Sequence, residues 1–232
     1  MHLLILGATG RTGVYGYKYA LEQGYHVTVL TRPDSSVPPQ ENLTVVEGSV
    51  MSETDMERAM TAAGVPVDAT LHFLNPHRAS DSPWAKFLGP PRLMAEAAAL
   101  AARGLRRQQQ QRPGAHKPRM VVLNAIGAGQ SRAVLPWCAR VFFDYTNISY
   151  TYKDHAAVDS EIEGNCQDDV RWTVAYAVGL SDEGAVPVKT FGLKETGFSF
   201  HITRESLARW MVDVAAGESK GDFDNRRVIV SN

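Results

Sequence analysis

Three glycines near the start of the chain have the spacing of a phosphate-binding turn. Gly7, Gly10 and Gly13 read G-x-x-G-x-x-G directly after the apolar run 3–6. The first glycine permits a sharp turn, the second lets the backbone approach a phosphate, and the third lets the next helix pack closely. The N–H groups and dipole of that helix then face the anion. The spacing predicts a dinucleotide site, and a tight turn without a ligand is the alternative. Further contacts are expected from Thr9, Arg11 and Thr12.

The residues after the second predicted strand indicate which dinucleotide binds. NAD-binding folds commonly place an acidic residue there to hold the ribose hydroxyls. This chain has Arg32 instead, and the nearest acid, Asp34, comes two residues later. A guanidinium pairs with a 2′-phosphate, whereas a carboxylate repels it. Arg32, with Arg11 as a second partner, therefore predicts NADP(H), unless Arg32 is simply a solvated loop residue. The expected cofactor contacts also include Ser49, Leu74 and Asn124.

A second group of polar residues follows the fifth predicted strand. Asn124 directly follows that strand and could hydrogen-bond the nicotinamide amide or a substrate carbonyl. His155 is a candidate proton donor, and Lys153 could polarise a carbonyl. With Tyr152 on the same helix, these four residues are the predicted catalytic set. The alternative is an ordinary polar helix face, with a histidine that only satisfies a backbone group.

The elements that would position these residues alternate between strand and helix. This order predicts an α/β fold with a Rossmann-type, doubly wound parallel sheet. We expect a single NAD(P)-binding domain over residues 1–232, with 178–202 as a small substrate-side loop and lobe near its C-terminus. The polar stretch 106–114 is expected to be an exposed loop. Strands are predicted at 2–6, 25–30, 43–46, 67–74, 120–123, 172–177 and 228–230. Helices are predicted at 12–23, 52–63, 92–103 (ending at Gly104), 149–163 and 204–216.

Composition narrows the class of protein. A net charge of −1 and 44% hydrophobic residues indicate an ordinary globular protein without a nucleic-acid-binding surface. The two cysteines fit no metal site or disulfide framework, so we expect a cytoplasmic protein without a metal. No segment is apolar enough for a membrane span. The expected partner is a small-molecule substrate. The oligomeric state could be a monomer or a homodimer.

The glycine turn together with Arg32 resembles that of the atypical short-chain dehydrogenases. More narrowly, the chain resembles the NmrA-like, NAD(P)H-binding group that includes biliverdin reductase B. The likeness extends to residues 121–129, 152–155 and 201–208. It implies an NADPH-dependent oxidoreductase that transfers a hydride to a small aromatic or conjugated carbonyl or quinone-like substrate. In that group a helix lysine such as Lys153 can also hold a cofactor ribose.

The departures from that resemblance leave the reaction open. Short-chain dehydrogenases with a proton relay use a serine and a Tyr-x-x-x-Lys helix pair, in which the lysine lowers the tyrosine pKa. Here Asn124 stands where the serine is expected, and no Tyr-x-x-x-Lys occurs. The group's Arg-Pro pair after the sixth strand is replaced near Tyr176 and Ala177. The alternatives are therefore a non-redox isomerase or cyclase with a structural or coupled dinucleotide, and an NADP(H)-sensing regulatory protein.

Overall fold

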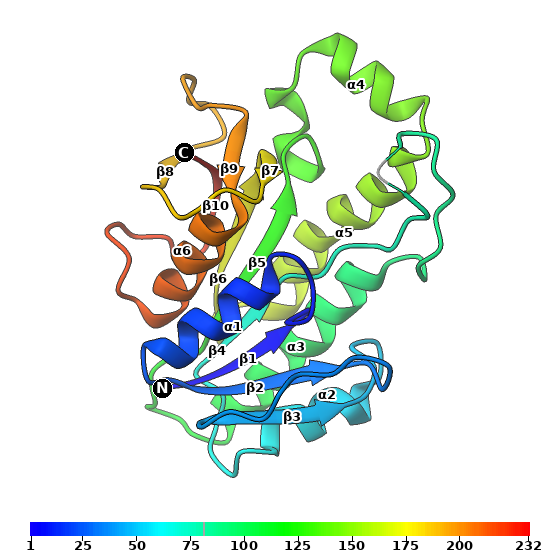
Figure 1. The fold of residues 1–232 in the computed structure, drawn as a ribbon. Helices are drawn as coiled ribbons and strands as arrows, with labels where there is room; N and C mark the ends of the chain where they lie inside the picture. The colour runs from blue at the N-terminus through cyan, green and yellow to red at the C-terminus, as the bar shows by residue number, and fades with distance from the viewer. Residues whose placement is uncertain (81) are drawn as a thin grey trace.

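A mostly parallel sheet forms the centre of the molecule. The computed structural model describes residues 1–80 and 82–232. Over these residues the sheet has eight strands in the order β3-β2-β1-β4-β5-β6-β10-β8, all parallel except the edge strand β8 (Figure 1). This arrangement confirms the predicted doubly wound α/β fold. The strands are β1 (His2–Leu6), β2 (His26–Thr31), β3 (Leu43–Glu47), β4 (Ala69–His72), β5 (Arg119–Ala125), β6 (Arg171–Ala177), β8 (Lys189–Phe191) and β10 (Arg226–Ser231).

Helices cover both faces of this sheet. Figure 1 shows α1 (Gly13–Glu22) beside α6 (Arg204–Ala216) on one face. The other face carries α3 (Leu93–Gln110), which packs between α2 (Glu53–Thr61) and α5 (Ile148–Cys166). A 3₁₀ helix, η1 (Gly129–Val134), and the short α4 (Trp137–Asp144) connect β5 to α5. The two-stranded pair β7 (Gly179–Ser181) and β9 (His201–Thr203) lies outside the main sheet.

The strand β1 is central because its sequence is apolar on both faces. Leu3, Leu4, Ile5 and Leu6 are completely buried, as a parallel strand covered by helices on each side requires. Its neighbours are β2 and β4, with Leu3 opposite Val27 on one side and Ala69 on the other. The strand order reverses between β1 and β4. In open α/β sheets, such a reversal at the carboxyl ends of the strands is the usual place for a ligand.

The predicted end of the third helix at Gly104 is wrong. The helix α3 continues through this glycine to Gln110, so the first residues of the expected loop 106–114 are helical. Gly104 is a packing position, because a Cβ there would collide with the side chain of Met60 on α2. Ion pairs tie down the last turns, Arg106 with Asp169 and Arg107 with Glu53. A glycine that permits close helix packing looks the same in the sequence as one that ends a helix.

The segment 178–202 is more closely joined to the sheet than a separate lobe would be. Its strand β8 pairs antiparallel with β10, with Ile229 opposite Phe191. Its strand β7 pairs with β9 through Gly179 and His201. The division of the chain into one domain with a substrate-side lobe stays a prediction.

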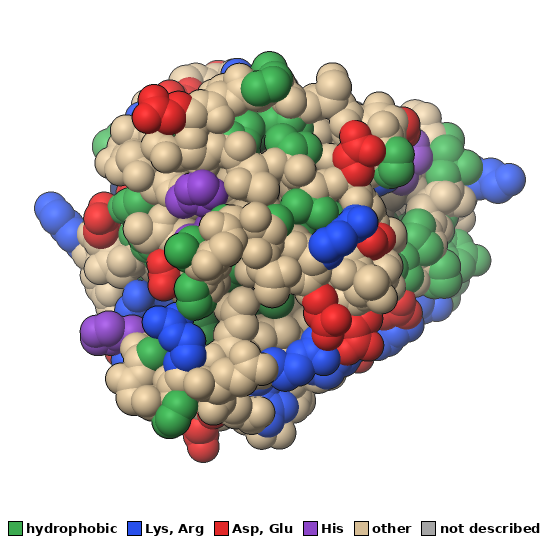
Figure 2. All heavy atoms as spheres, turned by 90° about the horizontal axis from the view of Figure 1, so that it is seen from below, with side chains coloured by type: hydrophobic (Ala, Val, Ile, Leu, Met, Phe, Trp, Pro, Cys, Tyr) green, Lys and Arg blue, Asp and Glu red, His purple; other side chains and the backbone are tan. Residues whose placement is uncertain are grey.

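The surface carries charges of both signs. On the face seen in Figure 2, basic and acidic side chains are interspersed. None of the described helices is long and apolar enough to cross a membrane.

A buried carboxylate on α5 holds the start of α3. The backbone N–H groups of Met94 and Ala95 donate to the two oxygens of Asp154, at 2.9 and 3.0 Å, and Asp154 is 3% exposed. These bonds satisfy N–H groups that the first turn of a helix leaves without a partner.

We expect Asp154→Asn to lower the free energy of unfolding by about 1–3 kcal/mol, because an amide cannot accept both of these bonds. Urea denaturation measures the change. Ser160→Ala on the exposed side of the same helix is the control and should change stability by less than about 0.5 kcal/mol. An Asp154→Asn protein as stable as the wild type would show that the carboxylate is not needed there.

Candidate functional site

The glycine turn lies at the carboxyl end of β1, where the strand order reverses. Gly7 has a φ of +79°, a backbone conformation that favours glycine, and its carbonyl accepts the N–H of Gly10 at 3.0 Å. A Cβ on Gly13 would collide with that same carbonyl oxygen. The helix α1 can therefore start directly against the turn, with its N-terminus at the carboxyl edge of the sheet. Thr9, Gly10 and Arg11 are exposed on top of the turn, whereas Thr12 is buried.

The turn also packs tightly against the neighbouring strand. A Cβ on Gly7 would lie 2.8 Å from the carbonyl oxygen of Phe73, which follows β4. Leu74 comes next and is half-buried. The backbones after β1 and β4 thus meet with no side chain between them, and the residues present fit a bound dinucleotide.

Arg32 stands at the carboxyl end of β2, as the sequence predicts. Its Nε lies 3.5 Å from the Asp34 carboxylate, and the two side chains are 72% and 73% exposed. Such an exposed pair is weak in water, so the guanidinium is available to a phosphate. Ser49, after β3, is also exposed, but its N–H donates to Asp55 and its hydroxyl accepts the N–H of Met51.

The structure joins Asn124 and His155 to each other rather than to an open site. The Asn124 amide donates to the carbonyl of His155 at 3.0 Å, and its oxygen lies 2.7 Å from Nδ1 of the His155 ring. That oxygen also accepts the N–H of Ala125. Nδ1 must carry the proton, because an amide oxygen only accepts. Both side chains are buried, at 1% and 6% exposure, so this geometry favours a bond that holds α5 against β5. Their catalytic and cofactor roles stay untested predictions.

Tyr152 and Lys153 reach a cavity of about 200 Å³ between α5 and the segment after β5. The Tyr152 hydroxyl donates to the carbonyl of Ile126 at 3.0 Å, and burial raises its pKa to about 12. Lys153 is exposed, with its Nζ 5.6 Å from the ring centre of Tyr150. Of the four predicted catalytic residues, these two line a cavity. The other walls are Gly127, Ala128, Gly129, Arg132, Phe143, Asp144, Ser149 and Ala156.

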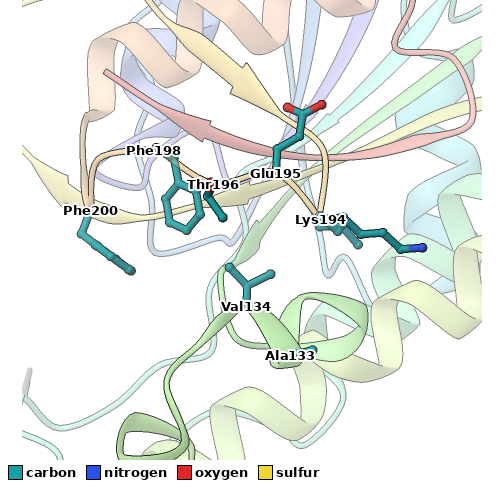
Figure 3. Close-up of a pocket in the computed structure, with 9 residues that line it drawn as sticks. Ala133, Val134, Lys194, Glu195, Thr196, Phe198 and Phe200 are labelled. Atoms are coloured by element: carbon teal, nitrogen blue, oxygen red, sulfur yellow. The ribbon is translucent and has the colours of Figure 1, made fainter.

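A larger cavity of about 410 Å³ lies between the connection after β5 and the segment 193–200. Phe198 and Val134 point toward one another across it, with Thr196 beside Phe198 and the Glu195 carboxylate directed away (Figure 3). The remaining lining residues are Ala133, Leu193, Lys194, Gly197 and Phe200. Seven of the nine lining residues lie in the segment 178–202 that the sequence analysis expects on the substrate side, but none of these side chains is singled out there. The alternation Phe198-Ser199-Phe200 after Gly197 is the one signal that could have indicated them.

Two large aromatic side chains are exposed outside both cavities. Trp84 and Trp137 are 66% and 73% exposed and line neither cavity. The Trp84 ring packs edge-on against Phe142, at 6.2 Å between ring centres. In the described part of the chain, no group of three or more metal-binding side chains is gathered.

Residues 7–218 match the sequence profile of the NAD(P)H-binding family. The chain belongs to this family. The match begins at Gly7 and includes the glycine turn, Arg32 and both cavities. It confirms that the turn belongs to a nicotinamide-dinucleotide-binding protein. No curated protein matches the chain.

Solved structures with the fold of this NAD(P)H-binding protein include short-chain dehydrogenases and other oxidoreductases. A wide-type short-chain dehydrogenase/reductase from Veillonella parvula in complex with NADP has a TM-score of 0.72 at 17% identity, over 100% of this chain and 94% of that one. The oxidoreductase ylbE from Lactococcus lactis has 0.66 at 15% identity, over 100% and 91%. ChuY, an anaerobilin reductase from Escherichia coli, has 0.68 at 14% identity, over 100% and 97%. At these identities the likeness establishes the fold.

Burial of two histidines in this family member makes stability depend on pH. Burial lowers the pKa of His155 from 6.5 to about 4 and that of His72 to about 3. Between these values and 6.5 the unfolded chain binds protons that the folded protein does not. The free energy of unfolding is therefore highest, as far as these histidines are concerned, above about pH 6.5. It decreases as the pH falls toward 4.

We expect His155→Gln to reduce the slope of unfolding free energy against pH in this range by up to about 1.4 kcal/mol per pH unit, the effect of one proton. Urea denaturation at several pH values measures the slope. The control is His116→Gln, which replaces an exposed histidine instead of a buried one. Equal slopes for His155→Gln and the wild type would mean that His155 does not resist protonation in the folded protein.

Proposed function

We propose that this protein is an NADPH-dependent oxidoreductase that reduces a small aromatic or conjugated carbonyl or quinone-like substrate. The observation that carries this proposal is the 410 Å³ cavity walled by Val134, Phe198 and Phe200. It borders the connection after β5, whose carboxyl end lies at the same edge of the parallel sheet as the glycine turn. Facing apolar walls suit a flat conjugated ring.

The cofactor would be held by the glycine turn and by arginines near it. Gly7, Gly10 and Gly13 bring the backbone to the pyrophosphate, and Arg32 with Arg11 would pair with the 2′-phosphate. Thr9, Thr12, Ser49 and Leu74 complete the proposed contacts. When bound, the reduced nicotinamide supplies a hydride.

The proton that completes the reduction would come from Lys153 or from water. Lys153 is the charged candidate on α5, and it lines the smaller cavity rather than the cavity proposed for the substrate. The Tyr152 hydroxyl donates to a backbone carbonyl, and its pKa is raised, so Tyr152 is a poor proton donor for the reaction. Asn124 and His155 would act by holding α5 in place. The reaction then depends mainly on orientation of the substrate, which can contribute much of a rate enhancement.

Free thiols support a reducing compartment such as the cytoplasm. Cys138 is exposed and Cys166 is buried, and neither is in a disulfide. The partner we propose is a small molecule. Monomer and homodimer both stay open.

We expect loss of NADPH absorbance when the protein is given simple quinones and enones, because these fit an apolar slot. A Val134→Trp variant, which fills the cavity, should lose most of this activity, and NADPH binding should stay within about twofold of the wild type. Product formed without net NADPH consumption would favour an isomerase or cyclase. Tight NADP(H) binding without turnover on any substrate would favour a sensing protein. Either result would overturn the proposed reductase.

We expect Arg32→Ala to weaken NADPH binding about tenfold or more, the usual effect of losing a charged hydrogen bond to phosphate. NADH binding should change by less than about twofold, since NADH lacks that phosphate. Titration of cofactor fluorescence measures both dissociation constants. The matched variant is Asp34→Ala, which removes the acidic partner of Arg32 and should tighten NADPH binding. Unchanged preference in Arg32→Ala would contradict the assignment of NADP(H) through this residue.

A further inference from the structure

One short segment forms a wall of both cavities. Residues 127–129 and Arg132 line the smaller cavity beside Lys153, and Ala133 with Val134 lines the larger cavity opposite Phe198. The position of segment 127–134 therefore sets the shape of both spaces at once.

A carboxylate on α5 holds the first half of this segment. The N–H of Gln130 donates to Oδ2 of Asp159 at 3.2 Å. The preceding residue, Gly129, has a φ of +49°, and a Cβ on it would collide with the same Asp159 oxygen. The segment thus passes so close to Asp159 that only a glycine fits without displacement.

Asp159 is itself fixed by residues from two strands of the sheet. The Tyr176 hydroxyl on β6 donates to Oδ2 at 2.5 Å, and Nε of Arg227 on β10 lies 3.3 Å from Oδ1. All three side chains are buried or nearly so. Arg227 also pairs with Glu163 at 2.7 Å and lies over the Trp172 ring at 4.6 Å. The carboxylate oxygens have little freedom to move.

Such a cluster is poorly explained by stability alone. Removing a carboxylate and a guanidinium from water costs several kcal/mol for each ion, and apolar residues of similar size often stabilise a core as well. Buried ion pairs are known to fix one conformation among several. Here the fixed element is the segment that walls the cavities, because Asp159 contacts its backbone directly.

Other bonds to this segment come from different directions. The Tyr152 hydroxyl holds the carbonyl of Ile126 just before it. Within it, the Ser131 hydroxyl accepts the N–H of Gly127 at 2.8 Å and donates to the carbonyl of Ala128. Ser131 makes the turn locally rigid, and Asp159 attaches that turn to the strands β6 and β10.

We propose that Asp159, held by Tyr176 and Arg227, is a positioning residue that fixes the wall shared by the two cavities and so places the substrate. Its action on the wall needs no assumption about the reaction. Its effect on catalysis rests on the proposed function.

The first test is hydrogen exchange of the backbone amides in 127–134, in the NADPH-bound protein. Asp159→Asn should speed this exchange about tenfold or more, because the local opening of the turn loses a charged bond. Asp154→Asn is the matched control, since it removes a buried carboxylate from the same helix that bonds α3 instead. It should leave exchange in 127–134 within about twofold of the wild type. Unchanged exchange in Asp159→Asn, or equal acceleration in both variants, would overturn the proposal.

The second test is steady-state oxidation of NADPH with menadione, an apolar quinone, as the probe. Asp159→Asn should raise KM or lower kcat for menadione about fivefold or more, with the dissociation constant of NADPH within about twofold. Faster exchange with unchanged kinetics would reject the positioning role. If the wild-type protein oxidises no NADPH with menadione or related quinones, the proposed function fails. The exchange result still decides whether Asp159 holds the wall.

If Asp159→Asn does not fold, Tyr176→Phe is the variant that tests the proposal. It removes one bond to Asp159 and retains the buried ring. We expect a smaller effect in the same direction, about threefold in exchange. Unchanged hydrogen exchange in this variant would contradict the proposal that Asp159 and its partners fix segment 127–134.

Discussion

The close approach of two backbones at the reversal of strand order is the constraint on which the site depends. A Cβ on Gly13 would lie 2.1 Å from the Gly7 carbonyl oxygen, and a Cβ on Gly7 would lie 2.8 Å from the Phe73 carbonyl oxygen. These contacts place the start of α1 at the carboxyl edge of the sheet, between β1 and β4. An anion at that edge meets N–H groups and a helix dipole rather than side chains. Any side chain at Gly13 would push α1 away and open the turn.

The edge beyond β5 is organised differently, by buried polar side chains. Asn124 and His155 use their hydrogen-bonding atoms on one another and so connect β5 to α5. With this connection made inside the protein, the polar residues of α5 that line the smaller cavity are Ser149, Tyr152 and Lys153. The sequence has no Tyr-x-x-x-Lys pair. Two polar residues of α5, Asp154 and His155, instead bond to neighbouring elements of the fold. A reaction at this edge would depend more on the shape of the cavity than on a proton relay.

Local signals explain which parts could be predicted from the sequence. The strand β1, the glycine turn and the helix at 204–216 each depend on residues adjacent in the chain, and these predictions agree with the structure. Gly104 was misread because its role depends on Met60, in another helix. The bond between Asn124 and His155 joins residues 31 positions apart, and the large cavity joins Val134 to Phe198. Contacts of this kind leave no local pattern, since only the folded topology brings the partners together.

The glycine-turn end and the cavity end of the site are expected to tolerate substitutions differently. The dinucleotide end is set by backbone contacts that need glycines and little else, so its chemistry stays recognisable when most of the sequence has changed. The fold persists at 14–17% identity to solved structures. The other end is set by side chains of two segments far apart in the chain, residues 133–134 and 193–200. Substitutions in 193–200 alter the apolar wall without touching β1 or α1. Segment 127–134 is less free, because Asp159 and the glycines at 127 and 129 restrict its path. Under the proposed function, divergence in substrate is therefore expected first on the Phe198 side of the cavity.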